Sequence, residues 1–168
     1  MGTLTPRRGS LLALWLLLFW IPALCCAAVT GRVSWVYDGD TLEVSGVGKV
    51  RLLGIDTPES KESPRDHFYW EEYRIPAGRL RQIAADALTR NIQRVKGERV
   101  RLEFDRQKQD RFGRTLAYLY LPDGSLLNRQ LIQEGLASTY RRYDFRLKQE
   151  FLDIEQQARE AAIGLWAQ

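Results

Sequence analysis

Three short segments of the chain carry acidic and arginine side chains that strand or helix formation does not require. Residues 38–41 read Asp-Gly-Asp-Thr, residues 51–59 read Arg-Leu-Leu-Gly-Ile-Asp-Thr-Pro-Glu, and residues 110–114 read Asp-Arg-Phe-Gly-Arg. Carboxylates bind hard cations, and the planar guanidinium of arginine binds two phosphate oxygens at once. The three segments therefore predict a site for phosphate chemistry if the fold brings them together.

The first two segments flank a predicted β-hairpin, so their carboxylates can be placed relative to each other. If the hairpin folds about Val47, residues whose numbers sum to about 94 lie opposite each other. Asp40 then lies near Gly54, one step from Asp56, and the two carboxylates meet at one end of the hairpin. Glu59 follows just past that end. Two carboxylates that converge with backbone oxygens suit a hard cation, Ca²⁺ or Mg²⁺.

Each segment also has an interpretation without chemistry. Asp-Gly-Asp is a common turn. Arg51 can pair with Glu43 across the hairpin in a surface ion pair of little energetic value, and residues 110–114 can form a solvated turn before a strand. These interpretations leave unexplained why all three segments stand at strand ends. Arginines beside a bound cation, in contrast, would neutralise the charge that grows on a phosphate group during transfer.

The strands that must position these segments follow from the alternation of apolar and polar residues. In the first half of the chain, Val33, Trp35 and Tyr37 are apolar, with Arg32 and Ser34 among them. Alternation recurs in three further segments, and a run from Thr115 to Leu121 that is apolar on both faces indicates a central strand, which makes five strands in all. The expected strands cover residues 33–37, 41–45, 49–52, 99–104 and 115–121.

Helical periodicity predicts three helices. An i, i+3, i+4, i+7 stripe runs from Leu80 to Val95, with Pro76 suited to the start of the helix and Gly97 to its end. Two shorter helices are expected over residues 126–133 and 147–161. Five strands with a helix between the third and the fourth is the order of an OB-fold barrel. The predicted fold is therefore mainly β with α, a five-stranded OB-fold barrel with three helices.

The composition limits the class of protein. The chain has 168 residues, of which 27% are charged and 45% hydrophobic, and this balance excludes a disordered, collagen-like or disulfide-framework protein. Of the 25 Lys and Arg, Arg7 and Arg8 lie in a separate leader, which leaves 23 against 21 Asp and Glu. An excess of +2 permits an anionic partner without demonstrating one.

Residues 1–28 have the pattern of a signal peptide. Residues 11–29 carry no charge and follow the Arg pair, and positions 27 and 28 are small. Cleavage would remove both cysteines and leave one domain, residues 29–168. With no cysteine and a single histidine, His67, this domain lacks the ligands that a zinc site needs. An uncleaved anchor is the alternative, since about 18 or more apolar residues can span a bilayer. On either interpretation the domain is extracytoplasmic: secreted or periplasmic, or else membrane-anchored.

Taken together, the three segments resemble the signature of the staphylococcal nuclease (thermonuclease) family. Their order and spacing agree with it, and Asn128, the Leu131-Ile132 pair and residues 134–137 (Glu-Gly-Leu-Ala) are also typical of it. The likeness covers nearly the whole chain after the leader, about residues 31–166. The motifs are specific in combination, whereas any one of them alone would be weak.

The resemblance implies a Ca²⁺-dependent phosphodiesterase on an OB fold. Such an enzyme cuts DNA and RNA and leaves 3′-phosphates. The metal ligands implied are the carboxylates of Asp40 and Asp56 and the backbone carbonyl of Thr57.

The resemblance also assigns catalytic roles to Arg51, Glu59 and Arg114. Glu59 would orient or deprotonate the attacking water, and the two arginines would grip the scissile phosphate. The chemistry agrees, because an in-line displacement needs a positioned water, a charge clamp and little else.

Further candidates concern the substrate. Arg111, Tyr140 and Tyr143 are candidate substrate-binding residues, and Tyr143 approximately matches a family tyrosine that stacks on a base. Phe112 departs from the family, in which Tyr often stands at this position. Because Phe112 has no hydroxyl, it cannot contact a terminal phosphate in that way.

The aromatic-rich residues 60–75 match the family poorly. They can form a flexible flap on which bases stack, or a loop with its own small apolar cluster. We expect His67 to belong to this segment rather than to act as the catalytic base, because Glu59 already fills that role.

Three functions must be distinguished: an extracytoplasmic Ca²⁺-activated nuclease, an inactive OB-fold module that binds single strands or a protein, and a membrane-anchored structural domain. An inactive relative would typically have lost one of the three catalytic residues, and all three are present. We therefore expect a nuclease that acts on nucleic acid as a monomer, with no stable protein partner. It would contact a membrane only if the leader is retained.

Overall fold

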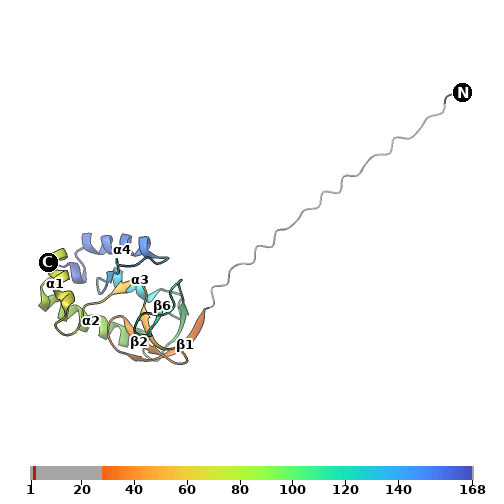
Figure 1. The fold of residues 1–168 in the computed structure, drawn as a ribbon, viewed down its shortest axis with the longest axis horizontal. Helices are drawn as coiled ribbons and strands as arrows, with labels where there is room; N and C mark the ends of the chain where they lie inside the picture. Colours follow the sequence, from red (N-terminus) through yellow and green to blue (C-terminus); the bar gives the residue numbers. More distant parts are fainter. Residues whose placement is uncertain (1, 3–27, 168) are drawn as a thin grey trace.

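The computed structural model describes residue 2 and residues 28–167, and its centre is a closed five-stranded barrel with the order β1-β2-β3-β6-β5 (Figure 1). β3 and β6 run parallel, and the other neighbouring barrel strands are antiparallel. This arrangement confirms the predicted OB-fold barrel. The barrel strands are β1 (Val29–Val36), β2 (Thr41–Val44), β3 (Gly48–Leu52), β5 (Arg99–Glu103) and β6 (Thr115–Tyr120).

The predicted leader lies outside the described residues, apart from positions 2 and 28. In the described part of the chain, no helix combines the length and the apolar character that crossing a membrane requires.

Alternate positions of the barrel strands point inward and form the core. Each such side chain contributes about 1.5–3 kcal/mol by its burial, so the barrel is a rigid support for the loops at its ends. The buried barrel positions include Val33, Val36, Leu42, Val44, Val50, Leu52, Val100, Leu102, Ala117 and Leu119.

The β2–β3 hairpin has a register two residues away from the expected one. Thr41 pairs with Arg51 and Val44 with Gly48, so the paired numbers sum to 92 rather than 94. The reason is the position of the turn: it comprises residues 45–47, centred on Gly46, whereas the expected turn was residues 46–48, centred on Val47. Gly46 and Gly48 have φ of 81° and 92°, a left-handed backbone that glycine adopts without a steric penalty.

β1 contains a β-bulge that changes which of its side chains face inward. The register of β1 against β2 shifts between Val33 and Trp35, because an extra residue there breaks the two-residue repeat. Val33 and Val36 are buried, whereas Trp35 and Tyr37 are exposed. The simple alternation of Val33, Trp35 and Tyr37 on one face was therefore a wrong prediction.

The three predicted helices are present as α2 (Ala77–Val95), α3 (Leu127–Gln133) and α4 (Lys148–Glu160). Figure 1 shows α1 and α2 at one side of the barrel and α4 above it, with the C-terminal end beside α1. A short 3₁₀ turn, Gly164–Trp166, follows α4. Its Trp166 ring packs edge-on against Tyr73 of α1, with 5.3 Å between the ring centroids.

A fourth helix, α1 (Pro64–Tyr73), occupies the aromatic-rich segment that we expected to be a flap or a loop. Ser63 and Asp66 form a capping box at its N-terminus, with Pro64 at the first helical position, and these features favour helix initiation. Tyr69 is almost fully buried, which fixes the helix against the core. His67 is exposed on this helix.

A second, two-stranded sheet lies beside the barrel. It pairs β4 (Ile55–Asp56) with β7 (Ser138–Thr139) in antiparallel orientation. β4 follows a reversal at Gly54, whose φ is 81°. This small sheet carries one of the predicted metal-binding carboxylates, that of Asp56.

The buried carboxylate of Glu155 joins α4 to β7. It accepts a hydrogen bond of 2.9 Å from the main-chain N–H of Thr139 and pairs with Arg141 at 3.0 Å and with Arg159. Burial acts to raise the pKa of Glu155, but the hydrogen bonds from Arg141 and Thr139 outweigh it and leave this pKa lowered.

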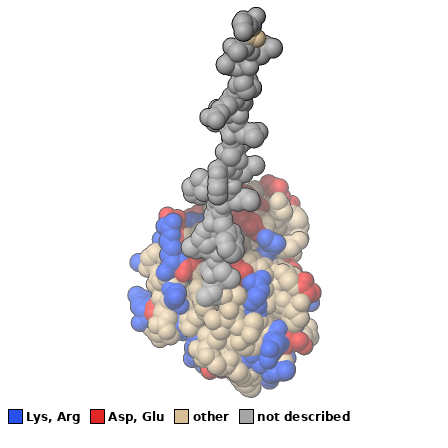
Figure 2. Space-filling view, turned by 90° about the vertical axis from the view of Figure 1, so that its right-hand side faces the viewer, with Lys and Arg blue, Asp and Glu red and all other residues tan. Residues whose placement is uncertain are grey.

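One face of the molecule carries charges of both signs. Figure 2 shows Lys and Arg interspersed with Asp and Glu on the face that it presents, without a continuous block of one sign. On this face no patch of one sign indicates a functional site, so the site must be located from the local geometry.

Candidate active site

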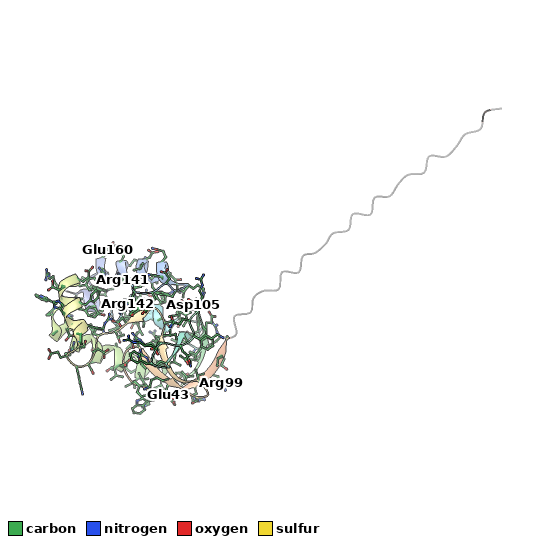
Figure 3. All side chains as sticks on the ribbon, in the orientation of Figure 1. Glu43, Arg99, Asp105, Arg141, Arg142 and Glu160 are labelled. Carbon is green, nitrogen blue, oxygen red and sulfur yellow. The ribbon has the colours of Figure 1, made fainter. Side chains whose placement is uncertain are left out.

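A cleft of about 710 Å³ opens where the β3 end of the barrel meets the loops before β6 and α4. Asp40 and Thr57 do not line it; they lie buried directly behind it. Asp105 and Arg142, also on the cleft wall, lie between the barrel and α4 in Figure 3. Seven of the nine predicted site residues line this cleft: Arg51, Asp56, Glu59, Arg111, Arg114, Tyr140 and Tyr143.

Arg51 lies between the two predicted metal-binding carboxylates. One of its terminal nitrogens forms an ion pair with Asp40, and the other lies 3.1 Å from Asp56 Oδ1. Both aspartates are buried. Burial lowers the pKa of Arg51, Asp56 opposes that change, and the positive charge of Arg114 adds to it. The alternative ion pair between Arg51 and Glu43 does not form, because Lys49 occupies the position opposite Glu43.

Asp38 shapes the turn that presents Asp40. Its carboxylate accepts hydrogen bonds from the main-chain N–H groups of Asp40, at 2.9 Å, and Thr41, at 2.7 Å. Burial raises the pKa of Asp38, although the charge of Arg51 and these hydrogen bonds act against the rise. The Asp-Gly-Asp turn is thus both a turn and a support for the site.

Gly39, in the same turn, is clamped between α2 and the second segment. The side chain of Asn91 on α2 donates a 2.7 Å hydrogen bond to the Gly39 carbonyl. A Cβ at Gly39 would lie 2.8 Å from side-chain atoms of Ala87 and Thr57. Only glycine fits this contact, which fixes the distance between the turn and Thr57.

The reversal at Gly54 brings Asp56 back toward Asp40 despite the shifted hairpin register. Thr57 donates hydrogen bonds of 3.0 Å from its main-chain N–H and from its hydroxyl to Asp40 Oδ2. A Cβ at Gly54 would approach the ring of Phe145 to 2.5 Å. The two carboxylates therefore converge, as expected, but through the β4 turn rather than through the hairpin alone.

The donor set around Arg51 fits a hard divalent cation. The carboxylates of Asp40 and Asp56 approach one guanidinium from two sides, so both oxygens face a common positive group. Thr57 donates hydrogen bonds to Asp40 from its main-chain N–H and its hydroxyl, so it lies beside this carboxylate. Oxygen ligands of this kind suit Ca²⁺ or Mg²⁺. Among residues 28–167, no group of three or more His, Cys, Asp or Glu side chains is placed to hold a metal ion.

Glu59 stands at the mouth of the cleft directly after the buried Pro58. It is exposed, and within the described part of the chain its carboxylate forms neither a hydrogen bond nor an ion pair. It is therefore available to a water molecule or to a substrate.

Asp110 orders the loop that carries Arg114. It accepts hydrogen bonds from the main-chain N–H groups of Phe112 and Arg114, and its second oxygen accepts one of 2.7 Å from Arg114 Nε. These bonds outweigh the effect of burial and lower the pKa of Asp110. Residues 110–114 therefore form a turn before a strand, which is the interpretation without chemistry. The same turn also directs Arg114 into the cleft.

Aromatic rings and arginines also line this cleft. Tyr140 and Tyr143 lie with their ring centroids 5.8 Å apart. Phe112 is 69% exposed, and the guanidinium carbons of Arg111 and Arg114 lie 4.7 Å and 5.5 Å from its ring centroid. This wall therefore combines stacking surfaces with positive charge.

Sequence reasoning missed Arg65 and Tyr69 of α1. Arg65 reaches across the cleft to Asp56 Oδ2 at 2.5 Å, and the hydroxyl of Tyr69 donates to the same oxygen at 3.3 Å. The Ser63-Pro-Arg-Asp66 capping signal could have predicted the helix and placed Arg65 in its first turn. The contact with Asp56 depends on tertiary packing that no local pattern reveals.

The geometry can be compared with known proteins. The family model described as "Staphylococcal nuclease homologue" matches residues 49–168, more than half of the chain. The chain belongs to the staphylococcal nuclease family. The resemblance carried by the three segments is thereby confirmed.

Relatives from several organisms agree with this family. The chain is 32% identical to a thermonuclease of Staphylococcus hyicus, over 82% of this chain and 76% of that protein. It is 34% identical to "Endonuclease YncB" of Bacillus subtilis, over 77% of this chain and 58% of that protein. It is 35% identical to "Uncharacterized protein MJ1439" of Methanocaldococcus jannaschii, over 81% and 70%. The family and its nuclease relatives support an enzymatic activity for this chain, the hydrolysis of phosphodiester bonds.

Proposed function

We propose that this family member is an extracytoplasmic, Ca²⁺-dependent nuclease that hydrolyses DNA and RNA and leaves 3′-phosphates. The observation that carries the proposal is the meeting of Arg51, Arg114 and an unpaired Glu59 in one cleft, beside two converging aspartates. An inactive binding module would need none of these groups in that arrangement. The predicted leader supports the location outside the cytoplasm.

The proposed reaction is an in-line attack of water on the phosphodiester. Glu59 takes a proton from the water as its oxygen bonds to phosphorus, the bond to the 5′-oxygen breaks, and the 5′-oxygen takes up a proton from solvent water. The products are a 3′-phosphate and a 5′-hydroxyl. A well-placed general base typically contributes about 10²–10⁴ in rate.

The two arginines stabilise the charge that develops on the phosphate. Arg51 is held by Asp40 and Asp56 and is largely removed from water, which strengthens its attraction for an anion. Arg114, fixed through Nε by Asp110, keeps its terminal nitrogens for the phosphate and for the leaving 5′-oxygen. Such preorganised donors stabilise the transition state more than the ground state.

Asp40, Asp56 and the Thr57 carbonyl would hold Ca²⁺ in this proposal. The ion would add positive charge next to the phosphate and lower the pKa of water.

The aromatic wall would bind the nucleotides on either side of the cleaved bond. Stacking on Tyr140 and Tyr143 tolerates any base, which suits an enzyme that accepts DNA and RNA. Arg111 would contact a neighbouring phosphate. One chain supplies every residue named here, so the enzyme can act as a monomer without a protein partner.

The experiment mixes the purified protein with denatured DNA or with RNA, in Ca²⁺, in Mg²⁺ or in chelator. We expect cleavage with Ca²⁺ and none with chelator. The product ends should accept a label at the 3′ position only after phosphatase treatment. Retardation of the strand without cleavage under every condition would refute the proposal and select the inactive module. Mass spectrometry of the mature N-terminus, with fractionation of the producing cells, tests the location.

A further inference from the structure

The outer surface of the barrel next to the cleft carries two exposed aromatic rings that the proposed catalytic function does not use. Because of the bulge in β1, Trp35 and Tyr37 point outward, and they are 52% and 44% exposed. Neither residue lines the cleft. Two large rings side by side on one strand face expose an apolar surface that water solvates poorly.

Each ring is paired with a lysine. Lys96, just after α2, lies with Nζ 4.5 Å from the ring centroid of Trp35, and Lys49 on β3 lies 4.2 Å from that of Tyr37. Within residues 28–167 neither lysine forms an ion pair with a carboxylate. Three arginines at the cleft do form such pairs: Arg51, Arg65 and Arg114. Each pair of ring and lysine therefore offers an aromatic ring together with a positive charge that no ion pair holds.

The strand register connects this surface to the cleft. Trp35 pairs with Glu43 on β2, and Glu43 pairs with Lys49 on β3. Lys49 and Arg51 are two residues apart, so their side chains share one face of β3, about 7 Å apart along the strand. The parallel pairing of Val50 with Thr115 also places Lys49 next to Arg114.

Glu43 is the acidic group within this surface, and it is engaged. Its carboxylate accepts a 3.0 Å hydrogen bond from the Tyr37 hydroxyl, which holds the ring in place. In Figure 3, Glu43 lies with Arg99 at the edge of the barrel away from α4. The surface thus begins beside the catalytic arginines and runs away from α4, toward Lys96 at the end of α2.

We propose that Trp35, Tyr37, Lys49 and Lys96 form a second binding site for single-stranded nucleic acid, here called the outer track. It holds the part of the substrate strand that extends beyond the cleft. Each ring stacks on one unpaired base, and its lysine contacts the adjacent phosphate. Single strands are favoured over duplexes, because paired bases present no free face to a ring. This inference rests on the proposed function.

The test compares long and short substrates. The wild-type protein and the double variant Trp35→Ala/Tyr37→Ala are titrated, in chelator, with a fluorescent 20-nucleotide oligothymidylate. Loss of base stacking at two rings should weaken binding about tenfold or more. Hydrolysis of a thymidine dinucleotide in Ca²⁺, which engages only the cleft, should keep its kcat/KM.

Trp70→Ala is the matched control, because Trp70 is similarly exposed, at 48%, but lies on α1 away from the outer track. It should leave binding of the long strand unchanged. A second variant, Lys49→Gln/Lys96→Gln, retains the rings. It should lower the slope of log K against log salt concentration by about 1.4, about 0.7 for each phosphate contact on a single strand.

Unchanged binding of the long strand by the Trp35/Tyr37 variant would overturn the outer track. An equal loss in Trp70→Ala, or an equal loss for duplex DNA, would overturn it as well. Failure of the proposed function would give a different result, because the wild-type protein would then cleave neither substrate with any metal. The binding comparison in chelator would still test the outer track.

Discussion

The guanidinium of Arg51 lies 3.1 Å from the carboxylate of Asp56, and its other terminal nitrogen pairs with Asp40. One residue thus links the turn before β2 to the short strand β4 and holds two buried negative charges near each other. The same guanidinium faces the cleft, so the stability of this end of the barrel and the proposed phosphate binding depend on a shared group.

Replacing Glu59 by Gln should lower kcat on denatured DNA by about 10² or more. The amide keeps the size of the side chain but cannot accept a proton. Because Glu59 is exposed and lacks a partner in the described residues, the melting temperature should not change. The comparison needs kcat and a thermal unfolding curve for both proteins. Retained turnover would remove Glu59 from the role of base.

Arg51→Ala should reduce both activity and stability. It leaves the buried carboxylate of Asp40 without its counter-charge and that of Asp56 with Arg65 alone, which costs about 3 kcal/mol. Ca²⁺ should replace part of that counter-charge, so the melting temperature of the variant should rise more on adding Ca²⁺ than that of the wild type. Thermal unfolding with and without the ion measures the difference. Equal shifts in the two proteins would mean that no cation binds between these aspartates.

Arg65→Ala should tighten the binding of Ca²⁺. Arg65 lies 2.5 Å from Asp56 Oδ2 and competes with a cation for that oxygen. If the ion pair is worth about 1 kcal/mol, its removal should strengthen affinity about fivefold, as measured by calorimetry without nucleic acid. Arg81→Ala is a suitable control, since Arg81 lies 2.5 Å from Asp66 instead. Weaker binding of Ca²⁺ by Arg65→Ala would show that Arg65 supports the metal site.

Glu155→Gln should destabilise the protein by about 3 kcal/mol at neutral pH, because it removes the buried partner of Arg141 and Arg159. The pKa of Glu155 is lower in the folded state, so its contribution is present above about pH 4.3, the ordinary value for Glu. It is lost as the pH falls through the folded pKa.

The free energy of unfolding, measured by urea titration from neutral to acid pH, should therefore fall less steeply in Glu155→Gln than in the wild type. Glu160→Gln, an exposed change at the end of the same helix, serves as the control. Parallel curves for the wild type and Glu155→Gln would contradict the role assigned to this carboxylate.

The periodicity of the sequence was sufficient to predict the barrel, because inward positions such as Leu42, Val50 and Leu102 alternate with polar neighbours. It failed at the bulge in β1. Trp35 and Tyr37 are as apolar as core residues, and an inserted strand residue has no distinctive type. The hairpin register failed for a related reason, since Gly46 and Gly48 both permit a turn and the pattern does not select which residue lies at its centre.

The candidate site was predicted from residue types in three motifs. The fold brings the second and third motifs to one cleft and buries Asp40 of the first behind it. The supporting contacts were not predictable. Arg65, Asn91 and Phe145 contact the site from segments whose own patterns indicate only helix or loop, and their placement follows from packing between distant elements.

β4 pairs with β7, and the hydroxyl of Ser138 donates to the main-chain oxygen of Asp56 across 82 residues of chain. β7 in turn is fastened by Glu155. During translation, the strand that bears Asp56 therefore has no sheet partner until residues 138–160 have been made. A growing chain therefore lacks a finished cleft until most of its synthesis is complete.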